Sequence, residues 1–559
     1  MRKSWRIAAS SVCLLVFAVG LVWGDRLLAL TRETRDNLRQ YTEILEVAHE
    51  RYGSEIHYRD LVFSSIQGML RQLDPHSNFL SPDAYDTMRE RQKGSFYGLG
   101  ILVGMRDEQL TVIAPLEGTP ASRMGLRAGD MIIAIEDEPT DDMTLDEAVS
   151  KLKGPKDTQV TITIVRPGVS NPMDITITRA EIPRTTVRYV HMMEDGETGY
   201  LRITEFSRST GEEVAEALEH LKEQGMERLL LDLRNNGGGL LDQAIEVADQ
   251  FVPRDTLIVE TRGRVRGSDE KYFAEGDHEP LDMPLVVLVN SGSASASEIL
   301  SGAIQDHDVG IIVGDTTWGK GLVQTVYGLS YGSALALTTA KYYTPSGRLI
   351  QRDYSSLYDY YARNNVPSEN GQGPETGLQS PDPPEPGEGD PTYRTDLGRV
   401  VYGGGGITPD VLVEAETEPE LLQFLRLNNA FFHFGVRYAD SHDIESLSWR
   451  PAEDVLREFQ EWLATEDLGE ADEIREAFSD PDTAQTALNR IRAEVFNSTF
   501  DNDAWYQALI EGDHQIQVAL EQFDRARNLL SRRLSVDEED RLAEGAGEAP
   551  EEAEARSDG

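Results

Sequence analysis

Residues 228–252, RLLLDLRNNGGGLLDQAIEVADQFV, decide the fold. The apolar RLLLDLR at the start predicts a strand buried on both faces. The glycines of NNGGGLL predict a turn, and DQAIEVADQFV predicts a helix. The same order recurs further along the chain. PLVVLVN (284–290) and VGIIVG (309–314) predict buried strands, with the helical SASEILSGAIQ (295–305) between them and the long strand SALALTTAKYYT (333–344) after them. This alternation predicts an α/β domain around a parallel sheet with both faces covered, and its functional residues should lie on loops at the carboxyl ends of the strands.

A different pattern precedes this domain. Residues 31–92 read as helical, and residues 93–168 contain short β-rich runs separated by glycine and aspartate turns. One helix interrupts these runs, TLDEAVSKLK, in which Thr144 and Glu147 have the spacing of a capping box. Residues 93–168 are therefore predicted to form a compact β-rich domain of their own.

The segments after the α/β domain differ in composition. The main body of that domain is assigned to residues 169–363, and the Pro/Gly/Glu-rich stretch 364–391 predicts a flexible linker. The domain resumes at 392–416, amphipathic helices follow at 417–535, and the acidic tail 536–559 reads as disordered. The apolar faces of the C-terminal helices are compatible with homo-oligomerisation, with an adaptor partner, or with packing on the α/β domain.

The overall composition excludes several classes of protein. The formal net charge of -45 disfavours nucleic acid as a partner, because a polyanion would be repelled. The single cysteine, Cys13, excludes an intrachain disulfide and Cys-rich metal sites. With 559 residues the chain is expected to form several domains rather than one core.

The N-terminus predicts export. A basic flank, MRKSWR, precedes an apolar run at residues 7–24, which is typical of a secretory signal or an uncleaved membrane anchor. Residues 1–30 are therefore interpreted as a signal peptide or N-terminal anchor. The bulk of the chain should be exported across the inner membrane, to a periplasmic or other extracytoplasmic location, either released or anchored by residues 7–24.

The stretch GDTTWGKG (314–321) has nearly the spacing of a phosphate-binding loop. That motif needs Ser or Thr after its lysine, where this chain has Gly321, and it should open a helix, whereas a β-like pattern follows. No H-E-x-x-H motif is present, so we expect neither a nucleotide, nor a metal, nor any other cofactor. Lys320 has another use, because a lysine whose pKa is lowered by burial to about 7–8 acts as a general base.

A cluster of serines follows the second buried strand, at a predicted strand-to-helix turn, where a helix N-terminus favours negative charge. Its members are either nucleophile candidates or helix caps and packing residues: Ser291, Ser293, Ser295 and Ser297. A G-x-S-x-G elbow is absent. The base for a nucleophilic serine would be His307 or Lys320.

At this point the motifs support a resemblance. GSASASEI, GDTTWGKGLVQT, LDLRNNGGGLL and GGGITPD resemble the carboxyl-terminal processing peptidases, also called tail-specific proteases, over roughly residues 35–415. GSFYGLGILV and GTPASRMGLRAGDMIIAI resemble the PDZ domain of that family. The resemblance implies a multidomain α/β fold, with a crotonase/ClpP-like protease core, an inserted PDZ domain, N-terminal helices and a C-terminal helical region.

The resemblance also implies roles for individual residues. Ser295 would be the nucleophile and Lys320 the general base of a Ser-Lys dyad, with Gln324 orienting the lysine amine. The oxyanion would be held by the backbone N–H of Ala296 and by that of Gly237 or Gly238. Many relatives have proline where this chain has Gly237, a change that we expect to be tolerated.

In the PDZ domain, the resemblance implies that a backbone turn captures the substrate's C-terminal carboxylate and that the following helix lines a side-chain pocket. The residues implied are Gly98, Leu99, Gly100 and Ile101 in the turn, and Leu145, Ala148 and Val149 on the helix. Substrates should then be proteins or peptides with apolar C-termini. A PDZ domain that serves only as a hinge or gate is the alternative.

These expectations combine into an exported serine endopeptidase that recognises C-terminal tails and cleaves with Ser295 and Lys320. Two other readings stay open. In one, the chain is a non-catalytic PDZ scaffold or adaptor of the cell envelope. In the other, a triad hydrolase uses His307 as its base.

Overall fold

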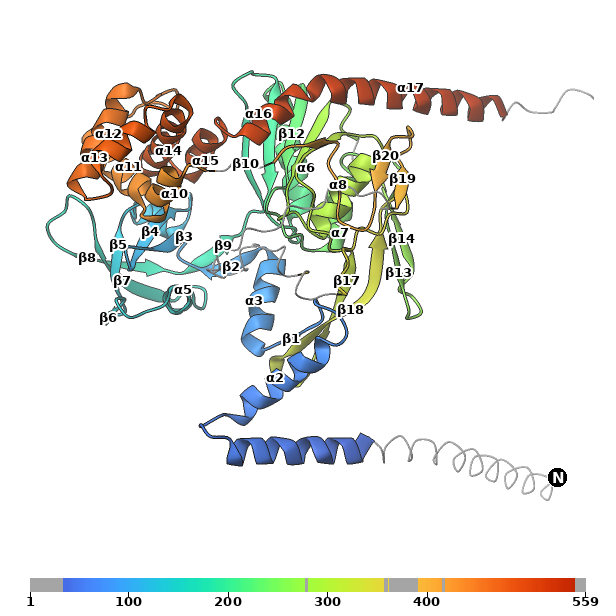
Figure 1. The fold of residues 1–559 in the computed structure, drawn as a ribbon, viewed down its shortest axis with the longest axis horizontal. Coiled ribbons are helices and arrows are strands. Elements are labelled where there is room, and N and C mark those ends of the chain that lie inside the picture. Colours follow the sequence, from blue (N-terminus) through green and yellow to red (C-terminus); the bar gives the residue numbers. More distant parts are fainter. Residues whose placement is uncertain (1–33, 277–279, 356–359, 361–390, 415–417, 548–559) are drawn as a thin grey trace, which may run out of the picture. The chain divides into compact units, whose positions relative to one another are not determined.

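A computed structural model describes residues 34–276, 280–355, 360, 391–414 and 418–547 (Figure 1). The predicted signal or anchor (1–30), most of the predicted linker (364–391) and the last residues of the acidic tail lie outside these ranges. The chain divides into two compact units, Met1–Pro82 with Gln324–Thr338, and Asp83–Val323 with Thr339–Gly559. Each unit is described by itself.

The first unit consists of helices and a small antiparallel pairing. Residues 34–51 are helical, and α2 (Tyr58–Leu70) and β1 (Asn78–Leu80) follow. β1 pairs with the start of β18 (Ala334–Tyr343), which also pairs with β17 (Leu322–Gly328) across the 3₁₀ turn η1 (Ser330–Gly332). The turn before β1 is organised by the Asp74 carboxylate, which accepts hydrogen bonds from the backbone N–H of His76 and Ser77 and from the Ser77 hydroxyl.

The second unit contains the predicted α/β domain. Its sheet has the strand order β10-β11-β12-β15-β16-β21 and is parallel except for the β10–β11 pair. The strands are β10 (Val187–Met192), β11 (Thr198–Ile203), β12 (Arg228–Asp232), β15 (Leu285–Val289), β16 (Ile311–Gly314) and β21 (Val411–Leu412). The connecting helices are α6 (Thr210–Glu223), α7 (Leu241–Ala248) and α8 (Ala296–Asp306). The predicted buried parallel strands are therefore confirmed, with one antiparallel edge strand.

Both faces of this sheet are buried, but by different parts of the chain. Leu229, Leu231 and Val287 pack in a core with α6, α7 and α8. Leu230 and Val286 point to the opposite face and pack with buried residues of three C-terminal helices, among them Tyr506, Ile516, Ala519 and Phe523. Alternate side chains of a strand point to opposite faces, so a run such as Leu-Leu-Leu requires cover on both sides. The C-terminal helices supply the second cover (Figure 1).

Smaller β elements flank this sheet. β13 (Leu257–Gly263) pairs with β14 (Glu270–Phe273) and, through Glu260–Gly263, with Ala340–Tyr343 of β18. β19 (Thr392–Arg394) and β20 (Val400–Tyr402) form a hairpin.

The β-rich domain is an antiparallel sheet of order β3-β4-β5-β7-β8 around its own core. Its strands are β3 (Ile101–Arg106), β4 (Gln109–Pro115), β5 (Met131–Ile135), β6 (Glu138–Pro139, paired with β5), β7 (Gln159–Val165) and β8 (Met173–Thr178). Its helices are α4 (Pro120–Arg123) and α5 (Leu145–Leu152); α3 (Pro82–Lys93) comes before it, and β2 (Ser95–Gly98) pairs with β9 (Ala180–Pro183). The sheet includes β8, so it extends past residue 168. The predicted capping box of Thr144 and Glu147 is present at the start of α5.

The C-terminal region is helical, with an aromatic-rich core of its own. Its helices are α10 (Glu420–Leu427), α11 (Ala430–Ser441), α12 (Glu453–Thr465), α13 (Ala471–Ala477), α14 (Pro481–Thr499), α15 (Asn502–Ile510), α16 (His514–Glu521) and α17 (Phe523–Gly547). The prediction of a disordered tail from residue 536 is wrong as far as Gly547, because α17 continues to that residue. Residues 536–547 contain three Glu, two Ala, one Leu and one Arg, which favour helix, and two Gly, which do not. Among the described residues, no helix is long and apolar enough to span a bilayer.

Candidate active site

The structure separates the four candidate serines by their burial and bonding. Ser293 and Ser297 are fully buried, and their hydroxyls donate to the carbonyl oxygens of Leu233 (2.8 Å) and Asn236 (2.9 Å). These two serines are therefore packing residues. Ser291 is exposed on the turn.

Ser295 differs from its neighbours. It is half-buried, it lies directly before α8, and its backbone has φ 55° and ψ -111°. A positive φ is costly for a residue with a side chain, and such strained positions cluster at functional sites. The position at the helix N-terminus also favours negative charge on a nearby oxygen. Ser295 is thus the serine of this cluster that has the setting of a nucleophile.

A buried carboxylate joins the serine turn to the lysine turn. Glu298 is fully buried and accepts hydrogen bonds from the backbone N–H of Ser295 (2.7 Å) and of Lys320 (2.9 Å) on the same oxygen, Oε2. Its Oε1 accepts from the backbone N–H of Gly319 (2.7 Å) and from the Thr317 hydroxyl (2.6 Å). The main chains of Ser295 and Lys320 are therefore held close together by one side chain.

All four groups that contact Glu298 are donors, so they match an ionised carboxylate, which only accepts. Burial raises the pKa of Glu298 above its ordinary value, and the hydrogen bonds from Thr317 and from the backbone of the lysine and serine turns oppose that rise. The carboxylate thus depends on this set of donors for its charge. The two turns supply the hydrogen bonds that stabilise the Glu298 charge, and the Glu298 carboxylate in turn holds the two turns together.

Two further contacts hold the lysine turn. The Trp318 N–H donates to the carbonyl oxygen of Ser293 (2.9 Å). The Tyr342 hydroxyl, on β18, donates to the carbonyl oxygen of Ser295 (3.1 Å) and to that of Lys320. Lys320 itself is half-buried.

The glycine turn after β12 lies against Ser295. The carbonyl oxygen of Asn236 accepts hydrogen bonds from the Ala294 N–H (2.9 Å) and from the Ser297 hydroxyl. Gly238 has φ 97°, and a Cβ added to it would lie 2.7 Å from the Cβ of Ser295. Only glycine can occupy that position without displacing the serine.

The predicted oxyanion donors have different surroundings. The N–H of Gly238 donates within its own turn, to Oδ1 of Asn236 (2.9 Å), so an oxyanion would compete with that oxygen for it. The same hypothetical Cβ on Gly238 would lie 2.9 Å from the backbone nitrogen of Ala296, which places the glycine turn and the first residue of α8 side by side. Gly237, by contrast, has open space around its Cα.

His307 lies at the opposite end of α8 from Ser295, as its C-cap. Ser295 and His307 flank this helix twelve positions apart, so at about 1.5 Å per residue they are separated by roughly 18 Å. Both ring nitrogens of His307 are engaged, Nδ1 with Asp396 and Nε2 with the carbonyl oxygen of Leu257, each at 2.7 Å. The triad reading with His307 as base is therefore wrong.

Gln324 belongs to the first unit, where its side-chain amide donates to the carbonyl oxygen of His76 (3.2 Å). Its role toward the lysine amine stays a prediction. Among the residues that the structure describes, no group of three or more His, Cys, Asp or Glu side chains is arranged to hold a metal ion.

The predicted peptide-binding residues all lie in the β-rich domain. Leu99 and Ala148 are buried in its core, with Leu145 packed against that core, whereas Ile101 and Val149 are half-buried. Gly98 pairs with Ala180 of β9. Gly100 has φ 78°, and its carbonyl oxygen accepts from the Leu116 N–H and from the Thr119 hydroxyl. The turn thus has a fixed backbone.

Comparison with known proteins identifies the family. Residues 197–355 match the profile of Peptidase family S41, and residues 111–166 match that of a PDZ domain. A carboxy-terminal-processing protease of Bartonella bacilliformis is 40% identical over 324 residues, which cover 57% of this chain and 74% of that protein. The chain belongs to the carboxyl-terminal-processing protease family.

Other members of this family show the same extent of similarity. The carboxyl-terminal-processing protease of a Picosynechococcus species is 36% identical over 358 residues, which cover 60% of this chain and 85% of that protein. Among solved structures, a photosystem II D1 C-terminal processing protease is 34% identical, with a TM-score of 0.32, and the match covers 55% of this chain and 83% of that one. The predicted family is thus confirmed, and the chain is a serine-type peptidase with a PDZ domain.

Sequence reasoning missed two parts of this processing protease's site. The link made by Glu298 had a signal, since Ser295 and Glu298 have the S-x-x-E spacing of a capping box, in which the glutamate reaches back to the N-cap N–H. The hydrogen bonds from the lysine turn to Glu298 had no signal in the sequence, because they depend on how two loops that are distant in sequence pack together. Tyr342 lies in a run of strand residues, and nothing in that run distinguishes it.

Proposed function

We propose that this protein is an exported endopeptidase that cleaves peptide bonds with a dyad of Ser295 and Lys320 and selects substrates by their C-terminal tails. The observation that carries the proposal is the Glu298 carboxylate, which bonds to the backbone N–H of both dyad residues. Because this buried side chain holds the backbones of Ser295 and Lys320 close together, it supports a site in which the two residues act together.

In the proposed reaction, Oγ of Ser295 attacks the scissile carbonyl carbon while a neutral Lys320 amine takes the hydroxyl proton. The tetrahedral intermediate carries its negative charge on the former carbonyl oxygen. That oxygen accepts from the N–H of Ala296 and from that of Gly237 or Gly238. Gln324 orients the lysine amine.

The intermediate collapses when the C–N bond breaks, and the Lys320 ammonium returns its proton to the leaving amine. A water molecule then attacks the acyl-enzyme ester, Lys320 again takes the proton, and the Ser295–acyl bond breaks with protonation of Oγ. Each step transfers one proton through the same amine, so the cycle requires no metal and no redox cofactor.

Tail selection is assigned to the PDZ domain. A peptide would add as a strand beside the sheet, with its carboxylate at the turn from Gly98 to Ile101 and its apolar side chain near Leu145 and Val149. Two features support this assignment, the family match over residues 111–166 and the fixed backbone of the turn at Gly100. Export is proposed from the apolar run at residues 7–24.

The first experiment measures cleavage of an unstructured reporter polypeptide ending in apolar residues, with chelator present, by wild type and by Ser295→Ala, Lys320→Ala and His307→Ala. We expect the first two variants to lose at least about a thousandfold in kcat, as loss of a nucleophile or its base does in serine proteases, and the third to retain activity. Retained activity in Ser295→Ala would refute the dyad. Equal cleavage of the same reporter ending in aspartates would refute tail selection while leaving the dyad in place.

A further inference from the structure

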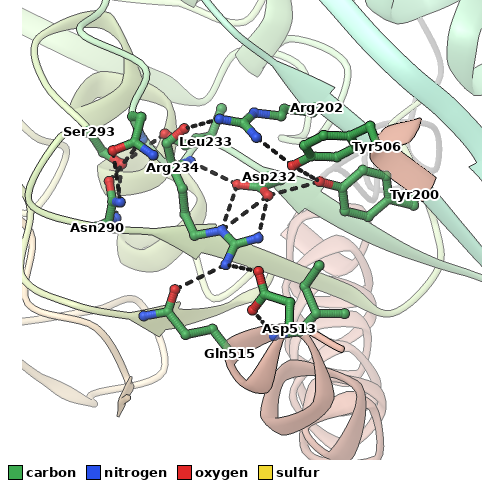
Figure 2. A network of polar contacts seen from close by, with 12 residues as sticks. Tyr200, Arg202, Asp232, Leu233, Arg234, Asn290, Ser293, Tyr506, Asp513 and Gln515 are labelled. Atoms are coloured by element: carbon green, nitrogen blue, oxygen red, sulfur yellow. Dashed lines mark hydrogen bonds and ion pairs between the residues drawn. The ribbon is translucent and has the colours of Figure 1, made fainter. Parts of the chain in front are cut away.

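The glycine turn that faces Ser295 is also bound from its other side. Arg234, directly before the two asparagines of that turn, directs its guanidinium toward Asp513 and Gln515 of the C-terminal helices (Figure 2). Its Nη1 donates to Oδ2 of Asp513 (2.7 Å) and to Oε1 of Gln515 (3.0 Å). Its Nε and Nη2 donate to Asp232, at the end of β12.

The C-terminal helices are also linked to the backbone of Arg234 through a second side chain, that of Arg202. Nη2 of Arg202 donates to the carbonyl oxygen of Arg234 (3.1 Å), and Nη1 of Arg202 donates to the Tyr506 hydroxyl of α15. That hydroxyl also lies 3.1 Å from the hydroxyl of Tyr200, which donates to Asp232 (2.8 Å). The cluster therefore contacts both the side chain and the main chain of Arg234 (Figure 2).

Most groups of this cluster are buried, although the Asp513 side chain is 26% exposed. Arg234 is 8% exposed, Asp232 is fully buried and Gln515 is 8% exposed. Burial opposes the ionisation of Asp232, but the charges of Arg234 and Arg202 outweigh it and hold the pKa of Asp232 below its ordinary value. A buried charge that loses a partner is strongly unfavourable, and the guanidinium would have to move to find another.

A shift of Arg234 would be transmitted to the nucleophile. The residue before it, Leu233, accepts the Ser293 hydroxyl through its carbonyl oxygen, and the Asn235 N–H donates to the side chain of Asn290 (2.8 Å). Beyond these two residues, Gly238 packs against Ser295. The turn between Arg234 and Gly238 is therefore held on one side by the serine turn and on the other by α15 and α16.

We propose that Asp513 and Gln515 are positioning residues for catalysis, which act through Arg234 to hold the glycine turn, and with it the oxyanion donors, in register with Ser295. The inference rests on the proposed dyad mechanism. It makes the C-terminal helices part of the catalytic unit. A displacement well under the length of a hydrogen bond at this turn would weaken stabilisation of the oxyanion, while the peptide would still bind.

Asp513→Asn tests this without removing the start of α16. Asp513 is the N-cap of that helix, with Oδ1 accepting from the Ile516 N–H, and asparagine is an equally good cap. The variant removes the charge that faces Arg234. Asp480→Asn is the matched control, because Asp480 caps α14 in the same region by a bond to the Thr483 N–H and its charge is fully solvated.

We expect Asp513→Asn in the full chain to lower kcat on the apolar-tailed reporter about tenfold with KM unchanged, less than the roughly hundredfold loss that removal of an oxyanion donor itself causes. Asp480→Asn should equal wild type in both constants. Hydrogen–deuterium exchange of the peptide spanning residues 233–240 should be faster in Asp513→Asn than in Asp480→Asn.

Equal kcat in the two variants, with equal exchange at residues 233–240, would overturn the inference even if Ser295→Ala abolishes cleavage. A rise in KM with kcat unchanged would also overturn it, because that result assigns Asp513 to substrate binding. If wild type shows no cleavage that depends on Ser295, the proposed function fails. Faster exchange in Asp513→Asn would then still establish the link between α16 and the turn.

Discussion

Of the two neighbouring glycines in the turn after β12, Gly238 and Gly237, only the first lacks room for a side chain. Gly238 has φ 97°, and a Cβ there would collide with Ala294, Ser295 and Ala296. Gly237 has open space where its Cβ would lie. The side chain of Ser295 therefore occupies space that is open only because residue 238 has no Cβ.

This difference predicts opposite results for two alanine substitutions. Gly238→Ala should lower kcat by roughly a hundredfold or more, because the methyl group displaces either the nucleophile or an oxyanion donor. Gly237→Ala should keep kcat within about threefold of wild type, since it leaves the backbone N–H in place and meets no atom. Both are measured on the same reporter, with the melting temperature of each variant as a check on folding. Equal losses in the two variants would show that the contact between Gly238 and Ser295 has no catalytic importance.

At the scale of elements, α8 has the proposed nucleophile Ser295 at one end and, at the other, the buried ring of His307 paired with the exposed carboxylate of Asp396. Burial lowers the pKa of His307, but hydrogen bonds to Asp396 and to the carbonyl oxygen of Leu257, together with the charge of Asp306, outweigh this and raise its pKa above the ordinary value. The folded chain therefore binds this proton more tightly than the unfolded chain does.

A raised pKa of a basic group fixes the sign of its pH dependence. The stabilisation by protonated His307 should be complete below the unfolded pKa of about 6.5 and should be lost as pH rises through the higher folded pKa. The gap in melting temperature between wild type and His307→Gln should thus be larger at about pH 5.5 than at about pH 9. A gap that stays constant or widens with pH would contradict the assigned hydrogen bonds. Cleavage that depends on Ser295 should persist in His307→Gln at both values.

At the scale of the whole molecule, local patterns predicted most of the protease core. RLLLDLR and PLVVLVN had to be strands covered on both faces. The strand-end patterns located the serine cluster and Lys320, and the family resemblance singled out Ser295; their catalytic roles stay predictions. What covers the second face could not be predicted, because amphipathic helices such as α16 do not indicate which apolar surface they meet. The same limit hid the contact of Asp513 with Arg234, two residues 279 positions apart in sequence.

The C-terminal helices pack on the sheet, and this answers a question that their sequence left open. They also reach the PDZ domain, where the Asn497 amide of α14 donates to the carbonyl oxygen of Ile113 (3.0 Å). One helical region thus contacts both the PDZ domain and the protease core. Their packing on the core does not exclude a further partner on their exposed surfaces.

Removal of these helices should therefore unfold the protease core rather than release it. A chain that ends at residue 419 would expose the sheet face formed by Tyr200, Leu230, Val286, Leu288 and Val313. Each such side chain contributes roughly 1.5–3 kcal/mol when buried, so the loss is comparable to the whole stability of a typical domain, about 5–15 kcal/mol. We expect this chain to aggregate, as judged by its soluble fraction and by size-exclusion chromatography, whereas a chain that ends at Gly547 should be soluble and active. A soluble, monodisperse and active chain ending at 419 would show instead that the helices are an independent accessory domain, and that the second face of the sheet has another cover.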